Sequence, residues 1–146
     1  MSNVATVAPR RIYLDTSAYL ALLLDEEGAD RLAQIVAGAT LLSSVLLILE
    51  SRRNLIRLTR AGTLKPSQYD GCINRIDEDI RRFELRDLTL DLCDSSLLPP
   101  IATPRSLDLA HLRSALWFHS QAPIDRFLTM DAAQAQAAKE LGLPVQ

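Results

Sequence analysis

The chain has little of what zinc sites and disulfide frameworks are built from. Only two cysteines occur among its 146 residues, Cys72 and Cys93, and neither a CxxC spacing nor a histidine pairing accompanies them. A structural zinc site is therefore not expected, and we expect two free, buried thiols. The two histidines, His111 and His119, fall eight residues apart on one expected helix, and we interpret them as surface or core residues rather than metal ligands.

Long apolar runs are also missing. No stretch approaches the roughly 18 apolar residues that a membrane-spanning helix needs. Residues 1–9 lack the charged start and apolar middle of a signal peptide. We therefore expect no membrane association and a cytoplasmic location. The hydrophobic content of 48% nonetheless suits a protein with one globular core. We expect a flexible tail over residues 1–10 and a single domain over residues 11–146.

An excess of positive charge is absent as well. The chain has 16 basic and 18 acidic residues, for a net charge of −2, which argues against bulk electrostatic attraction to nucleic acid. Any phosphate binding must come from local clustering, and residues 52–60 contain four arginines. Only Lys65 and Lys139 are lysines. This abundance of arginine suits planar phosphate recognition, and genomic base composition could equally produce it.

Strand-like and helix-like segments alternate along nearly the whole chain, which predicts an α/β fold with a parallel sheet between helices. The expected strands are residues 11–15, 40–43, 87–90, 124–129 and 142–145. The expected helices are residues 17–24, 29–37, 45–60, 66–83, 91–97, 106–119 and 132–141. For the helix at 106–119 we expect Ser106 as the cap and an inner face of Leu107, Ala110, Ser114, Trp117 and Phe118.

Four acids stand at or near junctions between these strands and helices. Asp15 and Asp131 follow strands, Asp108 opens a helix, and Glu50 lies on a helix that directly follows a strand. Each has a purely structural alternative. Asp15 can cap a helix, Glu50 can pair with Arg53, and Asp108 can interact with the helix dipole.

Parallel strands place their carboxyl ends along one edge of a sheet, so these acids are expected to share a rim. Several like charges held together are costly without a compensating cation. Hard divalent ions with oxygen ligands, Mg²⁺ or Mn²⁺, are the natural partners of such a cluster.

The segments that carry these acids resemble a known family. Residues 12–17 read IYLDTS, residues 49–53 read LESRR, residues 106–115 read SLDLAHLRSA and residues 127–131 read FLTMD. In this order they resemble a PIN domain, and within that superfamily the VapC-type toxins of bacterial toxin–antitoxin pairs. The likeness covers residues 11–146, although Met130 stands where a small or aromatic residue is more usual.

The resemblance implies a three-layer α/β/α sandwich with a mostly parallel sheet of about five strands. It also implies a Mg²⁺- or Mn²⁺-dependent endoribonuclease with Asp15, Glu50, Asp108 and Asp131 as the catalytic metal cluster. Further residues would assist: Thr16, Ser17 and Thr129 as supporting hydrogen-bond partners, and Arg52, Arg53, Arg57 and Arg113 as contacts to the RNA backbone. Arg53 and Arg57 are preferred because they share the helical face of Glu50. The implied partners are RNA, a cognate VapB-like antitoxin and a second copy in a homodimer.

Two other functions fit parts of the pattern. A catalytically silent PIN-like binding module would keep the acids for structure alone. A phosphatase with an aspartate nucleophile also begins with a strand ending in aspartate, but it needs a second acid two residues later and a suitably placed lysine. Position 17 is a serine, and neither Lys65 nor Lys139 is suitably placed.

Overall fold

Parallel strands form the centre of the molecule. The structure is a computed structural model that describes residues 7–94, 99–103 and 105–145, so the expected tail at 1–10 lies mostly outside it. In the described part, four strands pair in the order β3-β2-β1-β4, all in parallel. They are β1 (Arg11–Leu14), β2 (Thr40–Ser44), β3 (Phe83–Arg86) and β4 (Arg126–Leu128). The predicted α/β fold with a parallel sheet is confirmed.

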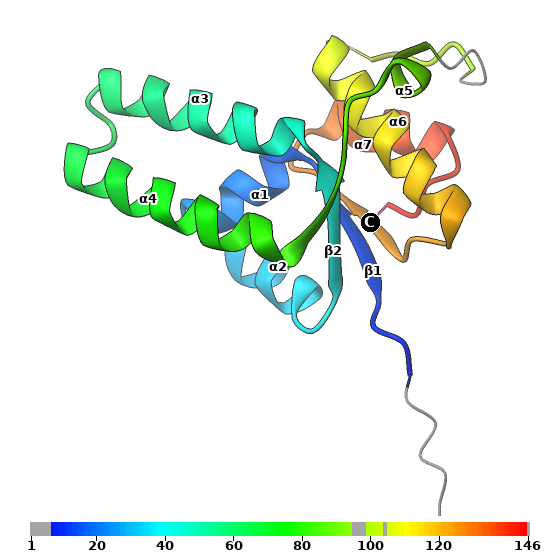
Figure 1. Cartoon of the computed structure of the whole chain (residues 1–146), viewed down its shortest axis with the longest axis horizontal. Coiled ribbons are helices and arrows are strands. Elements are labelled where there is room, and N and C mark those ends of the chain that lie inside the picture. Colours follow the sequence, from blue (N-terminus) through cyan, green and yellow to red (C-terminus); the bar gives the residue numbers. More distant parts are fainter. Residues whose placement is uncertain (1–6, 95–98, 104, 146) are drawn as a thin grey trace, which may run out of the picture.

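Helices cover both faces of this sheet (Figure 1). They are α1 (Thr16–Leu23), α2 (Ala29–Val36), α3 (Leu46–Arg60), α4 (Pro66–Asp79), α5 (Leu90–Asp94), α6 (Ser106–Gln121) and α7 (Ala132–Glu140), with a 3₁₀ turn η1 (Ile80–Arg82) after α4. Within the described ranges, no helix is long and apolar enough to cross a membrane.

The alternation of side chains along each strand creates the layers. One face of the sheet carries Tyr13, Leu42 and Phe127, which pack against buried residues of α6 and α7. The opposite face carries Ile12, Leu14 and Leu128, which pack against α1 and α2. Two apolar clusters thus lie on either side of the central strand β1, and they fix the positions of the helices that follow each strand.

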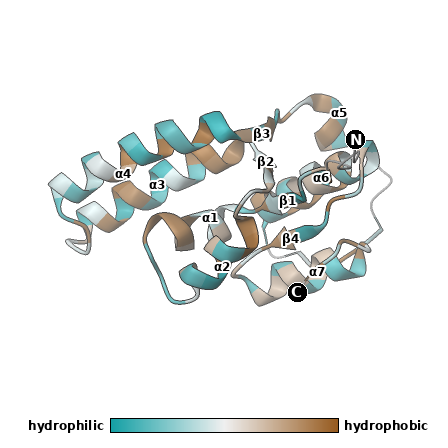
Figure 2. Ribbon diagram, turned by 90° about the horizontal axis from the view of Figure 1, so that it is seen from below, coloured by the Kyte–Doolittle hydropathy of each residue, from teal (hydrophilic) through white to brown (hydrophobic). Residues whose placement is uncertain are grey.

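A third apolar cluster joins α3 and α4 to the body of the protein. Leu47, Leu55 and Ile76 are fully buried and pack with Tyr19 of α1. Tyr69, Cys72, Ile73 and Ile80 pack around them. Figure 2 shows the two helices side by side, projecting from the sheet, with hydrophilic and hydrophobic residues mixed along both. This pairing anchors the helix that carries Glu50.

The strand expected at residues 87–90 is wrong. The α-helix ends at Asp79, the 3₁₀ turn η1 continues it to Arg82, and β3 begins at Phe83. Leu88 and Leu90 are 44% and 83% exposed, so these leucines do not contribute to a buried strand. The expectation of buried thiols is also wrong for Cys93 on α5, which is free but exposed.

Two further expectations need correction. In the described residues, the segment at 142–145 contributes only one bridge, between Phe127 and Val145, so the sheet has four strands rather than about five. On α6, Leu107 and Trp117 are 43% and 37% exposed. Ser114 and Phe118 are buried as expected, and Leu112 and Ala115 complete the buried face in place of Leu107 and Trp117. Its N-cap residue is Arg105 rather than Ser106.

Candidate functional site

Four acidic side chains from separate elements line one crevice of about 490 Å³. Asp15 follows β1, Glu50 lies on α3, Asp108 lies in the first turn of α6, and Asp131 follows β4. β1 and β4 are adjacent although they are the first and last of the four strands. Open parallel sheets bind ligands at such switch points, outside the carboxyl ends of their strands. The structure therefore brings together all four acids nominated by the sequence.

Asp15 is held in place by the start of α1. Its Oδ1 accepts hydrogen bonds from the Ser17 hydroxyl at 2.6 Å and from the backbone N–H of Ala18 at 3.1 Å. The side chain is only 4% exposed. Burial raises the pKa of this carboxyl and outweighs the opposing hydrogen bonds from Ser17 and Thr129. Asp15 therefore caps α1, as the structural alternative to a functional role predicts, and this cap holds its carboxylate at the crevice.

Asp131 caps α7 in the same way. Its Oδ1 accepts from the backbone N–H groups of Ala133 and Gln134 at 2.8 and 3.3 Å. Thr129 accepts from the N–H of Asp131 at 3.1 Å and lies 3.1 Å from the Ser17 hydroxyl. Thr129 and Ser17 therefore connect the loops that carry the two aspartates, which is the supporting position expected for them.

Glu50 is oriented by a buried polar network. Its Oε1 accepts from the Thr16 hydroxyl at 2.8 Å and lies 2.9 Å from Nε2 of His111. Because a carboxylate only accepts, Nε2 donates to Glu50. Nδ1 of the ring lies 2.7 Å from the hydroxyl of Tyr13, and in the neutral ring it accepts from that hydroxyl. Burial alone would raise the pKa of the Glu50 carboxyl, but its interactions with His111 and Thr16 outweigh burial and lower it.

Asp108 interacts with the charges of all three other acids. Burial raises the pKa of its carboxyl, and the negative charges of Asp131, Asp15 and Glu50 raise it further, while Arg105 opposes them. Gln134 of α7, which is fully buried, donates through Nε2 to the carbonyl of Asp108 at 2.9 Å. That bond joins the first turns of α6 and α7, and so holds Asp108 and Asp131 at the same crevice.

The arginines expected to contact RNA divide into two pairs. Arg53 and Arg57 line a second hollow that continues from the acid crevice. Arg52 instead pairs with Asp77 of α4 at 2.7 Å. Arg113 donates to two backbone carbonyls of α5 at 3.0 and 2.7 Å. Neither Arg52 nor Arg113 lines the acid crevice or the second hollow, and their expected contact with RNA stays a prediction.

A comparison with protein families agrees with this geometry. The PIN domain profile matches residues 12–145, nearly the whole chain. The chain belongs to the PIN domain family. A comparison with curated proteins finds no significant match. PIN domains are generally nucleases, so the crevice of this PIN domain is a candidate nuclease site.

The four acids of the PIN domain do not form a preassembled cation site. Among residues 7–94, 99–103 and 105–145, no group of three or more His, Cys, Asp or Glu side chains has the arrangement of a metal site. The hydrogen bonds described above go to one oxygen of each of Asp15, Glu50 and Asp131. The carboxylates are thus positioned as a set but still apart.

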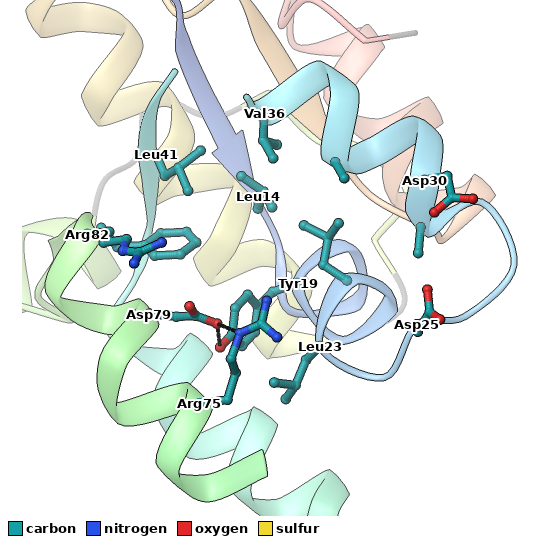
Figure 3. Close-up of a pocket in the computed structure, with 14 residues that line it drawn as sticks. Leu14, Tyr19, Leu23, Asp25, Asp30, Val36, Leu41, Arg75, Asp79 and Arg82 are labelled. Atoms are coloured by element: carbon teal, nitrogen blue, oxygen red, sulfur yellow. Dashed lines mark hydrogen bonds and ion pairs between the residues drawn. The ribbon is translucent and has the colours of Figure 1, made fainter. Parts of the chain in front are cut away.

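A different hollow of about 280 Å³ opens between α1, α2 and α4 (Figure 3). Leu23, Val36 and Leu41 are among the apolar residues that line it. Three of its polar groups bind one another, because Asp79 accepts from the Tyr19 hydroxyl at 2.8 Å and pairs with Arg75 at 3.4 Å (Figure 3). Asp25 and Asp30 lie on one side of the hollow, and Arg75, Asp79 and Arg82 lie on the other.

Four residues at the site are not predicted as site residues from the sequence. His111, interpreted as a surface or core histidine, is a core residue that contacts Glu50. Asn54 and Arg105 line the crevice, and Gln134 joins α6 to α7. Asn54 could have been found, since it shares the helical face of Glu50. The other three depend on contacts between distant segments, for which the sequence carries no local signal.

The Tyr13 hydroxyl supplies a testable contribution to this network. Tyr13→Phe is expected to lower the free energy of unfolding by about 1 to 3 kcal/mol, because Nδ1 of buried His111 loses its partner. Urea denaturation measures the effect. Tyr69→Phe is the matched control, since the hydroxyl of Tyr69 has no hydrogen-bond partner in the described part of the chain, and its stability should stay within about 0.5 kcal/mol of wild type. Equal stability of both variants would contradict the network.

The raised pKa of Asp108 predicts a pH-dependent gain from neutralising it. Below the ordinary aspartate pKa of 3.8, the carboxyl is protonated in both the folded and the unfolded chain, so Asp108→Asn removes no charge. Above it, ionisation is harder in the folded protein, so the carboxylate costs stability as the pH rises. In EDTA, Asp108→Asn should raise the melting temperature at pH 7, with a smaller gain at pH 4.

Thermal melts at the two pH values test this prediction for the Asp108 variant. Asp70→Asn is the control, because Asp70 is an exposed aspartate on α4 outside the crevice. A gain for Asp108→Asn that is no larger at pH 7 than at pH 4 would contradict the raised pKa of this carboxyl.

Proposed function

We propose that this PIN domain is a metal-dependent endoribonuclease and the toxin of a type II toxin–antitoxin pair. The observation that carries the proposal is the convergence of four carboxylates from separate elements, close enough that three of them raise the pKa of the fourth. Holding four carboxylates together lowers the stability of the fold, because like charges repel one another, so stability alone does not explain the cluster.

The donor set fits a hard divalent cation. Asp15, Glu50, Asp108 and Asp131 offer oxygen ligands only, which suits Mg²⁺ or Mn²⁺. A bound ion of this kind lowers the pKa of water and offsets charge on a phosphate under attack. The chain's own residues position the carboxylates: Ser17 holds Asp15, and Thr16 and His111 hold Glu50.

The crevice gives less support to the alternatives. A phosphatase with Asp15 as nucleophile lacks its helpers, because Ser17 donates to Asp15 and neither Lys65 nor Lys139 lines the crevice. A silent binding module would keep the acids for structure alone. Structure accounts for Asp15 and Asp131, which cap helices, and for Glu50, which binds Thr16 and His111. It accounts less well for Asp108, which caps no helix and whose pKa is raised by burial and by the charges of the other three acids.

For the antitoxin, we propose docking in the hollow of Figure 3. Its apolar floor is flanked by Arg82 and the Arg75–Asp79 ion pair on one side and by Asp25 and Asp30 on the other. An amphipathic antitoxin segment with acidic residues along one edge and basic residues along the other would match both the floor and the charges. The homodimer implied by the resemblance to VapC-type toxins stays a prediction.

Asp15→Asn tests the nuclease proposal. It should abolish cleavage of single-stranded RNA in Mg²⁺ or Mn²⁺ and should also remove any rise in melting temperature that Mn²⁺ gives the wild type, since ligand binding stabilises the folded state. Asp70→Asn, outside the crevice, is the control. Full metal-dependent cleavage by Asp15→Asn would refute the assignment. A wild type that neither cleaves RNA nor responds to Mn²⁺ would favour the silent binding module.

Arg82→Glu tests the docking groove. Reversal of this exposed charge at the rim should weaken binding of the cognate antitoxin by about tenfold, or about 1.4 kcal/mol. Arg81→Glu is the matched control, because Arg81 is the exposed neighbour that does not line the groove. Titration calorimetry with the purified antitoxin measures both. Equal affinity for the two variants would exclude this groove as the docking surface.

A further inference from the structure

The acid crevice continues into a second hollow of opposite charge. Four residues line both: Glu50, Asn54, Arg105 and Asp108. The second hollow, of about 520 Å³, adds Arg53, Arg57 and Leu107. A molecule in the acid crevice can therefore extend directly onto a surface with three guanidinium groups.

These guanidinium groups are not occupied by acids of the described chain. Neither Arg53, Arg57 nor Arg105 has a carboxylate within ion-pair distance in that part of the protein, in contrast to Arg52 and Arg86. All three are exposed. They are therefore available to an external anion.

Asn54 orders part of this surface. Its Nδ2 donates to the carbonyl of Glu50 at 2.9 Å, and its Oδ1 accepts from Arg57 at 3.3 Å. One side chain thus links the helical turn that carries Glu50 to the guanidinium group of Arg57. Arg105 stands at the N-terminus of α6 and lines both hollows together with Asp108. Arg105 therefore lies at the junction of the two hollows.

We propose that the second hollow is a subsite for non-scissile phosphates of a single-stranded RNA, with Arg105 binding nearest the acids and Arg53 and Arg57 binding farther along. This inference rests on the proposed nuclease function, and it places the RNA strand along the second hollow, leading into the acid crevice. From Glu50 to Arg57 the helix rises about 10 Å, which matches about three nucleotides of a stacked strand. Arginine forks suit phosphate oxygens in this role.

The acids themselves make such a subsite necessary. Four carboxylates repel a polyanion, and the chain as a whole has a net charge of −2, so no general attraction retains the RNA. Phosphate contacts position a nucleic acid without reading its sequence. Arginines beside the crevice would hold the strand while leaving the scissile phosphate to the acids.

Salt dependence of RNA binding tests the subsite. The probe is a fluorescein-labelled 12-nucleotide single-stranded RNA, bound in Mg²⁺ by the full chain with Asp15→Asn to prevent cleavage. In this background, Arg105→Gln and Arg57→Gln should each reduce the slope of log affinity against log salt by about 0.7, the value for one phosphate contact on a single strand. The double variant should lose about 1.4. The loss should be the same for RNAs of different sequence.

Two variants serve as controls. Arg52→Gln removes the same charge from the same helix, but Arg52 pairs with Asp77 and lies outside both hollows, so its slope should be unchanged. Arg105→Lys keeps the charge and should retain the wild-type slope. Circular dichroism confirms that each variant is folded. Equal slopes for Arg105→Gln and Arg52→Gln, or no binding of the RNA at all, would overturn the subsite.

Cleavage by the chain with an intact Asp15 separates the two proposals. If it cleaves RNA and the slopes do not change, the subsite fails and the nuclease stands. If it does not cleave but the slopes fall as expected, the subsite stands and the protein is an RNA-binding module. An acidic protein segment as the true occupant would appear as unchanged RNA slopes, which counts against the subsite.

Discussion

Electrostatic repulsion among four carboxylates is the constraint on which the site depends. Asp15, Glu50, Asp108 and Asp131 come from four elements, and each would separate from the others if its own segment were free to move. The fold resists this with ordinary structural bonds: helix caps at Asp15 and Asp131, a buried histidine at Glu50, and the Gln134 bond at the backbone of Asp108. The residues that stabilise the fold are thus also the residues that form the site. A helix cap at Asp15 or Asp131 is therefore compatible with a function for the same side chain.

The sequence predicts those parts that depend on local chemistry. Alternating strands and helices indicate a parallel sheet, and the rule that carboxyl ends share an edge places Asp15 and Asp131 together. Helical spacing also places Arg53 and Arg57 with Glu50, and the structure finds all three at adjoining hollows. The boundaries of the strands are harder to predict from the sequence. Leu88 and Leu90 have the apolar character of a strand, but they fall after β3 has ended and face solvent.

The remaining features arise from contacts between segments far apart in the chain. The polar role of His111 requires Tyr13 and Glu50 to approach it from 98 and 61 residues away. Arg105 becomes a site residue only because α6 begins beside the acids, and no local pattern distinguishes it from the other arginines. Arg52 and Arg113 show the converse, since each is engaged by a neighbour that the sequence does not place near it.

The arrangement of charge suits the proposed function, in which a protein that is acidic overall binds a polyanion. A uniformly basic surface would attract RNA and other polyanions alike, and the net charge of −2 excludes it. The protein instead separates its charges locally, with carboxylates in the crevice and arginines in the adjoining hollow. Attraction is then confined to a strand that passes through both, and a cation in the crevice would link the two by offsetting the repulsion between the acids and the phosphate. Without that cation the acids oppose the bound strand, so metal binding and RNA binding are expected to strengthen each other, as thermodynamic linkage requires of two ligands coupled at one site.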